Sequence, residues 1–463
     1  MFVETIDIAI AVRDRRRLMK ASDSPTLPST PFLGAYHELF NSEDLWATAR
    51  RVGAVERERK IDMPALVEST VLAMSGLPGT QTSALANYVQ LMGEAVAPSA
   101  FYDRFTEPFT DLMADVSRRA IAAVRAVAPE EGEARDLAAL LEHFRDVQAA
   151  DSTCQILKRF ADHWAPSTSP ERPASFKLHA IVSLKDGLPV EQHVSPQRDH
   201  DSPQLADDAL TAGTLFLADL GYVDHARLLR LKRRGVYVLM RLKKGHNPRI
   251  RRVRTGKGSK LACRGMTLDD ALATGALDFD HGHLDVEVTV SANIDGVATE
   301  ETFRVVGLAH PDDPEGDWYY LTTVSHDILS VEEVSLAYTL RWDIELLWKH
   351  LKTGVGFAAI RAWRRSAVIA LVHAKITGVA LGRLLELAAK PALKDHAMGQ
   401  LAIVLALNRS LPMILSLRMR GQNIDLAEME RRILLVATTI AKSRNRRRDR
   451  AKTAKRAALS TAG

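Results

Sequence analysis

The spacing of apolar positions changes near residue 145. From residue 36 to that point the pattern is mostly helical, with short apolar segments at 65–77, 83–92 and 99–109 that LPGT and APS separate. Short helices with such turns resemble a helix-turn-helix arrangement, although helix pairs of this kind are frequent in plain bundles. The pattern predicts a helical N-terminal domain and leaves open whether it binds DNA ends.

Alternation with a period of two follows. Residues 176–184 (FKLHAIVSL) alternate apolar with mostly polar side chains, and a turn at Asp186-Gly187 leads into PVEQHVS, which indicates a hairpin. A shorter strand ending at Asp151 precedes it, and the apolar run TLFLAD, a helix at 224–233 and the strand VYVLMR follow it. Three antiparallel strands followed by alternating helix and strand predict an α/β fold, a mixed sheet flanked by helices in the order of the ribonuclease-H fold.

A strand-rich insertion then interrupts this order. It holds a basic loop, the strictly alternating LDVEVTV, an Asp295-Gly296 turn, FRVVGL and WYYLTT, and helices resume at about Val331. A chain of 463 residues is too long for one hydrophobic core. The expected regions are a helical N-terminal domain at 1–145, a first core part at 146–245, the insertion at 246–325, a second core part at 326–390, and a helical C-terminal region with a basic tail at 391–463.

Charge changes this picture through its placement. Lys and Arg number 62 against 57 Asp and Glu, so the net excess is only five. Residues 241–264 nevertheless hold ten basic residues and no acidic one, and nine more basic residues lie at 442–456. Such clusters create a local positive potential that a phosphate backbone neutralises. Each run taken alone is equally consistent with a solvated loop or tail.

Several classes of protein are disfavoured. The two cysteines, Cys154 and Cys263, form no CxxC pair, so neither a zinc site nor a disulfide framework is indicated. The first apolar run follows acids and precedes bases, which is the wrong order for a secretory signal. The apolar stretch at 367–385 is broken by a histidine and two cations and indicates a buried helix instead of a membrane span. We therefore expect a cytoplasmic protein without a membrane partner.

The segment at 331–354 (VEEVSLAYTLRWDIELLWKHLKTG) is the most informative. At about 100° per residue, Tyr338, Arg341, Glu345 and Lys352 share one face of a helix, and leucines occupy the other. A solvated amphipathic helix with a simple Arg341–Glu345 ion pair would show the same periodicity. The spacing Tyr338-x2-Arg341-x3-Glu345-x6-Lys352, however, is similar to the YREK signature of bacterial DDE transposases of the insertion-sequence-four family.

The resemblance extends upstream and covers about residues 145–390. ADSTCQIL places Asp151 where that family has its first catalytic aspartate, and LFLADLGYVD places Asp219 where it has the second. The resemblance implies that Asp151, Asp219 and Glu345 are catalytic metal ligands in a ribonuclease-H-like fold. It also implies that Tyr338, Arg341 and Lys352 contact DNA.

The activity that the resemblance implies is DNA transposition. Such an enzyme binds the inverted ends of its mobile element as a homodimer on double-stranded DNA, cleaves them and joins the 3′ ends to target DNA, in association with the bacterial nucleoid. Chemistry supports this assignment, because three hard oxygen ligands can hold two Mg²⁺ ions, or Mn²⁺ in their place, about 3.5 to 4 Å apart. Such ions acidify the attacking water or 3′ hydroxyl and stabilise the leaving oxygen.

Rival metal ligands are present. Asp199 and Asp201 follow the third strand, and Asp224 follows Asp219 by five residues. Asp219 is preferred because the apolar strand TLFLA delivers it to a sheet edge, whereas Asp224 is better placed to cap the next helix. The histidine-containing segment at 278–285 (DFDHGHLD) suggests a metal site, but its position between turn residues and a strand favours an exposed loop.

Other interpretations stay open. A nuclease or recombinase of the same fold would cleave element ends without joining them. A catalytically inactive DNA-binding derivative is disfavoured, since all three carboxylates and the Tyr-Arg-Lys set are present. Core packing is the favoured role for Trp318, Trp342 and Trp348, although Trp318 could stack on a flipped base.

Overall fold

The computed structural model divides the chain into two compact units, which are described separately. The larger unit is Ser42–Arg383 and the smaller comprises Met1–Asn41 and Leu384–Gly463. The structure describes residues 31–57, 61–75, 79–128, 135–242, 245–258, 262–309, 317–342, 344–345, 348, 360, 362–393, 433–436 and 439–440. The predicted basic tail and Lys352 lie outside these described residues. In the smaller unit, α2 (Pro31–Leu39) buries Phe32, Leu33 and Tyr36.

Helices fill the N-terminal part of the larger unit. They are α3 (Ser42–Arg51), α4 (Met63–Met74), α5 (Gln81–Met92), α6 (Pro98–Tyr102), α7 (Glu107–Val127) and α8 (Arg135–Leu141). Asp62, Thr80 and Thr106 each accept a hydrogen bond from the backbone N–H three residues ahead, which fixes where α4, α5 and α7 begin. That this region is a separate domain that binds DNA ends stays a prediction, as do the bounds of the other four regions.

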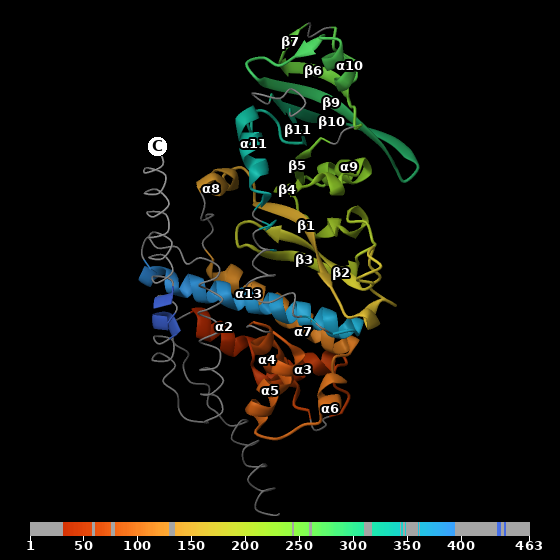
Figure 1. The fold of residues 1–463 in the computed structure, drawn as a ribbon. Coiled ribbons are helices and arrows are strands. Elements are labelled where there is room, and N and C mark those ends of the chain that lie inside the picture. The colour runs from red at the N-terminus through yellow and green to blue at the C-terminus, as the bar shows by residue number, and fades with distance from the viewer. Residues whose placement is uncertain are drawn as a thin grey trace, which may run out of the picture. The chain divides into compact units, whose positions relative to one another are not determined.

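A nine-stranded mixed sheet follows, with strand order β3-β2-β1-β4-β5-β11-β10-β9-β6 (Figure 1). Its first five strands are β1 (Asp146–Ile156), β2 (Ser175–Ser183), β3 (Leu188–Pro196), β4 (Thr214–Ala218) and β5 (Tyr237–Arg241). Strands β1, β2 and β3 are antiparallel, whereas β4 and β5 run parallel to β1. The predicted ribonuclease-H-like α/β fold is confirmed by this order of three antiparallel strands and two parallel ones.

The insertion extends the same sheet. Its strands are β6 (Arg249–Thr255), β9 (His283–Ile294), β10 (Val297–Leu308) and β11 (Trp318–Thr322), and β11 pairs with β5. A small sheet of β7 (Lys257–Gly258) and β8 (Leu277–Asp278) and the helix α10 (Leu268–Ala273) accompany them. One hydrophobic cluster runs from Phe216 and Val238 to Val286 and Val305. The insertion therefore shares its core with β4 and β5.

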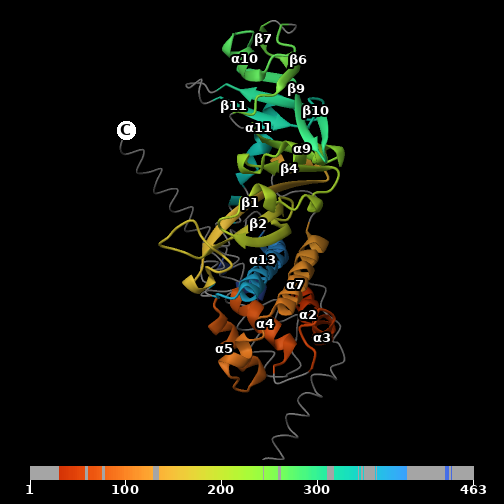
Figure 2. The ribbon, with the colours of Figure 1, turned by 90° about the vertical axis from the view of Figure 1, so that its right-hand side faces the viewer.

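Helices α9 (His225–Arg233) and α11 (Val331–Thr339) flank the sheet near β5, as the two views in Figure 1 and Figure 2 show. The capping box of Ser330 and Glu333 begins α11. The continuous helix predicted over 331–354 is wrong at one point. The helix α11 ends at Thr339, a turn covers Leu340 and Arg341, and helical backbone returns at Trp342.

Helix α13 (Arg365–Leu393) contains a stretch, Arg365–Ala389, that is long and apolar enough to cross a membrane. Of its apolar window 78% is buried inside the protein, as in a core helix. A Cβ atom added to Gly378 would lie 2.4 Å from Ser75 Oγ, so glycine permits a close approach to the end of α4. Gln192 Nε2 lies 3.1 Å from His373 Nδ1 and links α13 to β3. The predicted buried helix is confirmed.

Three further expectations need correction. Strand β1 continues to Ile156 instead of ending at Asp151, because β2 pairs with it over this whole length. The first part of the predicted basic loop is the edge strand β6, whose Ile250 and Val253 reach the core. Trp318 and Trp342 are exposed at 47% and 58% and do not pack in the core.

Candidate active site

Asp151 and Asp219 occupy matching places on neighbouring parallel strands. The ladder between β1 and β4 ends with the pair Ala150 and Ala218, and each aspartate is the next residue. Because the carboxyl ends of parallel strands meet at one edge of a sheet, the two side chains start from adjacent backbone positions. Beyond this point β4 leaves the sheet, whereas β1 continues with β2 as its only partner strand in the described chain.

One oxygen of each aspartate is held by local backbone. Asp219 Oδ1 accepts a 2.8 Å hydrogen bond from the N–H of Leu220 and caps the short turn η4 (Leu220–Tyr222). Asp151 Oδ1 likewise accepts from the N–H of Ser152 at 2.8 Å. These hydrogen bonds orient each carboxylate through its Oδ1 atom.

The segment after α11 reaches Asp151 through Trp348. The Trp348 indole Nε1–H donates to Asp151 Oδ2 at 3.0 Å, across 197 residues of sequence. Trp348 is buried, so the packing role expected for it is confirmed, but this hydrogen bond was not foreseen. Nothing in the local sequence signals a contact between positions so far apart in the chain.

Arg341 is the cation at this site. It is only 7% exposed, and its Nη2 donates to Glu345 Oε1 at 3.2 Å. Its guanidinium lies 5.8 Å from the ring centroid of Tyr338 and 5.2 Å from that of Trp342, within range of cation–π attraction. Arg341 Nε has no hydrogen-bond partner in the described part of the chain. The i,i+4 pair therefore exists, but its arginine is buried and incompletely satisfied.

The electrostatic setting of Asp151 favours an added cation. Burial raises the pKa of this carboxyl group, and the charge of Glu345 raises it further. Hydrogen bonds from Ser152 and Trp348 and the charge of Arg341 lower the pKa, but they do not offset burial completely. Arg341 and Glu345 therefore act on the pKa of Asp151 in opposite directions.

Two tyrosines border the carboxylates. Tyr338 on α11 is 6% exposed, its ring lies 5.1 Å from that of Tyr320, and burial raises its pKa to about 12. Tyr222 ends the turn that Asp219 begins, and burial together with the charges of Asp151 and Asp201 raises its pKa. The sequence prediction missed Tyr222, although it is part of the motif ADLGYVD that contains Asp219.

The structure brings some predicted residues together and leaves others untested. Among the described residues, no group of three His, Cys, Asp or Glu side chains is close enough to hold a metal ion as it stands. Glu345 instead faces Arg341, so a ligand set of Asp151, Asp219 and Glu345 stays a prediction. The rival Asp224 caps α9, as expected. His281, in the histidine-containing segment, is 92% exposed, which fits the expected loop.

Comparison with known proteins agrees with this arrangement. Residues 142–378, a little more than half of the chain, match the family described as the transposase DDE domain. The chain belongs to this family of DDE transposases, and it groups with those of bacterial insertion sequences.

Two curated relatives come from Bacillus thuringiensis. The transposase of insertion sequence element IS231B, from subsp. berliner, is 23% identical over 246 residues, which are 46% of this chain and 50% of that protein. The transposase of IS231F, from subsp. israelensis, is 21% identical over 270 residues, or 52% and 57% of the two chains. The chain thus spans about half the length of the curated relatives it matches.

One solved structure is similar over most of its length. It is the piggyBac transposase in a synaptic complex with hairpin DNA, with 9% identity and a TM-score of 0.46. The likeness covers 89% of this chain and 87% of that one. The fold assignment rests on the strand order described above.

Proposed function

We propose that this DDE transposase binds the inverted ends of its mobile element, cleaves them and joins the freed 3′ ends to target DNA. One observation carries the proposal. Asp151 and Asp219 follow the last paired residues of two parallel strands, and Arg341, which pairs with Glu345, is also influenced by the charge of Asp219. Three carboxylates drawn from two strand ends and a helix suit metal-assisted phosphoryl transfer.

The donor set fits a divalent cation. Carboxylate oxygens are the ligands that Mg²⁺ prefers, and Mn²⁺ accepts the same ligands. The raised pKa of Asp151 means that its negative charge is poorly compensated without a metal. We therefore assign Asp151, Asp219 and Glu345 as ligands of two Mg²⁺ ions, which acidify the attacking hydroxyl and stabilise the leaving oxygen when bound.

Arg341 links DNA binding to this ligand set. Its guanidinium now holds the carboxylate of Glu345. A DNA phosphate, like a carboxylate, presents two oxygens that the planar guanidinium of arginine can bind in a bidentate manner. We propose that Arg341 exchanges Glu345 for a phosphate near the scissile bond, which releases Glu345 to join Asp151 and Asp219.

Further DNA contacts are assigned to the rest of the signature. Tyr338 packs beside Arg341, and we assign its hydroxyl to the same phosphate and Lys352 to the next contact along the strand. Trp348 and the rings of Tyr222 and Tyr338 are buried, and burial of these rings lowers the local dielectric and so strengthens electrostatic interactions nearby. We also propose that the protein acts as a homodimer on paired ends of the element, associated with the bacterial nucleoid in the cytoplasm.

The test uses DNA carrying an element end, a target plasmid and Mg²⁺. The wild-type protein should cut at the end and join the 3′ hydroxyl to the plasmid. Asp219→Asn should bind the DNA but lose cleavage, because the basic surfaces that bind phosphates are unchanged. Asp224→Asn is the matched control, since asparagine still caps α9 and cleavage should persist.

Three results would overturn the proposal in different ways. Cleavage without joining would identify a nuclease. Binding without cleavage, under Mg²⁺ and under Mn²⁺, would identify an inactive DNA-binding derivative. Loss of cleavage in Asp224→Asn but not in Asp219→Asn would move the second ligand to Asp224.

A further inference from the structure

A polar network reaches Asp151 from the other face of the sheet. Asp201 Oδ1 accepts a hydrogen bond from Ser152 Oγ at 3.0 Å and another from Lys177 Nζ at 3.0 Å. Ser152 is the residue whose N–H donates to Asp151 Oδ1 at 2.8 Å. A continuous chain of hydrogen bonds therefore runs from Lys177 through Asp201 and Ser152 to Asp151.

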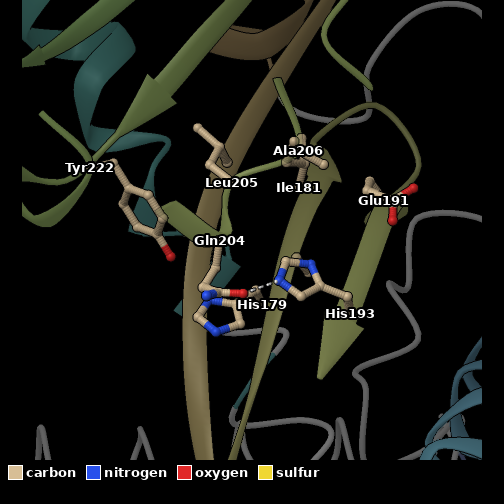
Figure 3. Close-up of a pocket in the computed structure, with 9 residues that line it drawn as sticks. His179, Ile181, Glu191, His193, Gln204, Leu205, Ala206 and Tyr222 are labelled. Atoms are coloured by element: carbon tan, nitrogen blue, oxygen red, sulfur yellow. Dashed lines mark hydrogen bonds between the residues drawn. The ribbon is translucent and has the colours of Figure 1, made fainter. Parts of the chain in front are cut away.

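The strand pattern places this network behind Asp151. Successive side chains of a strand point to opposite faces, so Ser152 lies on the face opposite to Asp151. Ser152 pairs with His179 on β2, and His179 pairs in turn with His193 on β3. The two imidazoles stack with centroids 4.9 Å apart, beside a small pocket that Tyr222 also lines (Figure 3).

Lys177 is the cation that faces Asp201. His179 Nδ1 is 3.7 Å from Asp201 Oδ1, but burial and the neighbouring His193 lower the pKa of His179 to about 4. Its ring is therefore neutral at pH 7, and its Nε2 lies 2.9 Å from Ser195 Oγ. The charge of Asp201 is thus balanced by Lys177, and the two stacked histidines pack beside this ion pair.

The loop that carries Asp201 is fixed from behind by Arg227 of α9. Arg227 is 6% exposed, and it donates from Nη1 to Ser202 Oγ at 2.8 Å and from Nη2 to Ser202 O at 2.6 Å. Its Nε lies 2.7 Å from Asp207 Oδ1. In the same loop, Gln204 Oε1 lies 3.1 Å from His193 Nε2 (Figure 3). Asp201 consequently has a defined position.

Strand β1 needs such an anchor at this point. Up to Ala150 it is held on both sides by β2 and β4, but β4 ends at Ala218. From Asp151 onward the backbone is paired on the β2 side alone within the described residues. The hydrogen bond from Ser152 to Asp201 supplies a second attachment one residue beyond the carboxylate.

We propose that Asp201 is a positioning residue of the transposition reaction: it anchors Ser152, and through the Ser152 N–H it fixes the orientation of Asp151. This inference rests on the proposed function of Asp151 as a metal ligand. Groups that orient metal ligands typically contribute about 10- to 100-fold to metal affinity or activity, because a ligand that must be ordered on binding costs entropy.

The experiment compares Asp201→Ala, Ser152→Ala and the double variant. Each single change should lower single-turnover cleavage of bound end DNA about 10-fold, and the double variant should be no slower, because both remove the same link. Asp201→Asn should recover part of the rate, since its amide oxygen still accepts from Ser152. DNA affinity and melting temperature should stay near wild type.

Asp199→Asn is the matched control. It lies two residues away in the same loop and contributes its backbone carbonyl, not its side chain, to Lys177. Its cleavage rate should equal that of the wild type. A rate for Asp199→Asn as low as that for Asp201→Asn would show a general effect of loop charge and would overturn the proposal.

Binding of Mn²⁺, followed by electron paramagnetic resonance without DNA, gives a second readout. Asp201→Ala and Ser152→Ala should weaken Mn²⁺ binding to a similar extent. If the wild type binds Mn²⁺ but does not cleave DNA, this readout still tests the positioning role of Asp201 when the proposed function has failed. If Asp201 were itself a ligand, Asp201→Asn would abolish Mn²⁺ binding while Ser152→Ala left it intact. Wild-type Mn²⁺ binding and cleavage in both alanine variants would also overturn the proposal.

Discussion

Two buried arginines in this protein face carboxylates in different ways. In the insertion, Arg304 forms a bidentate pair with Asp285, with both distances at 2.9 Å, and donates a third bond of 2.7 Å to Leu329 O. Arg304 and Asp285 are both nearly inaccessible to solvent. In the candidate active site, Arg341 makes one 3.2 Å contact with Glu345, whose side chain is 38% exposed.

This difference distinguishes a structural pair from the pair to which we assign a function. Every donor nitrogen of Arg304 has an acceptor, so exchanging a partner would leave buried charge uncompensated. Arg341 has an unused Nε and is held mainly by two aromatic rings. Its single carboxylate partner is partly exposed, so a phosphate could replace it and keep the buried charge compensated. We expect an arginine that must bind a substrate phosphate to be arranged in this second way.

The largest expected effect is on stability, in Asp285→Ala. Removal of the carboxylate strands the charge of Arg304 in the core and should lower the free energy of unfolding by about 3 to 5 kcal/mol. Glu345→Ala is the matched change at the second pair, where the carboxylate is partly exposed and makes a single contact, and it should cost less than Asp285→Ala. Guanidinium denaturation of both variants measures this. An equal loss in Glu345→Ala would end the distinction between the two pairs.

Arg341→Ala should affect catalysis more than folding. If the guanidinium grips a phosphate beside the scissile bond, its loss should cost about 2 to 4 kcal/mol in the transition state. Arg341→Lys keeps the charge without the planar fork and should recover only part of the activity. Cleavage at saturating protein is measured alongside thermal unfolding. Wild-type cleavage with a clearly lower melting temperature would assign Arg341 to structure.

Asp151→Asn should stabilise the protein when divalent metals are removed. Burial raises the pKa of Asp151 above its unfolded value of 3.8, so the folded state disfavours its charged form. This penalty is absent below the unfolded pKa and complete above the folded pKa. The melting temperature of Asp151→Asn in EDTA should therefore exceed that of the wild type at pH 7, and the gain should vanish towards acid pH. A lower melting temperature at pH 7 would contradict the assignment.

The smallest effect concerns two arginines of β6. Arg254 pairs with Glu287, whereas Arg252 is exposed and shows no partner among the described residues. Arg252→Ala should reduce the salt dependence of DNA binding by about 0.9 log units for one lost phosphate contact, with little change in stability. Arg254→Ala should change stability more than the salt slope. If the salt dependence of DNA binding were unchanged in both variants, β6 would be a solvent-exposed edge strand that does not contact DNA.

The sequence determines the strand order more clearly than the site. Apolar alternation and the run TLFLA were enough to place Asp219 at the end of a buried strand, because burial imposes a period that local sequence displays. The polar stretch from Ser152 to Ile156 gave no such signal. It lies where β1 has lost its β4 neighbour, so it buries little apolar surface.

Features that depend on distant contacts were not predictable. The turn at Arg341 interrupts a segment whose periodicity is compatible with one helix. The surroundings of the buried Arg341 side chain include the ring of Tyr338 and the charges of Asp219 and Glu345. The Ser152–Asp201 bond joins residues 49 positions apart and required the loop geometry that Arg227 imposes. The sequence marks Asp201 as a rival ligand, but it gives no sign of the contact with Ser152.

The hydrogen bond between Trp348 and Asp151 also has a consequence for the timing of biosynthesis. The two residues are 197 positions apart, so at roughly 5 to 20 residues per second Trp348 leaves the ribosome about 10 to 40 s after Asp151. Strands β1 and β4 can pair during this interval, but Glu345 has yet to be translated. A nascent or truncated chain would therefore carry two of the proposed ligands without the third, and the metal site that we propose would stay incomplete until Glu345 is made.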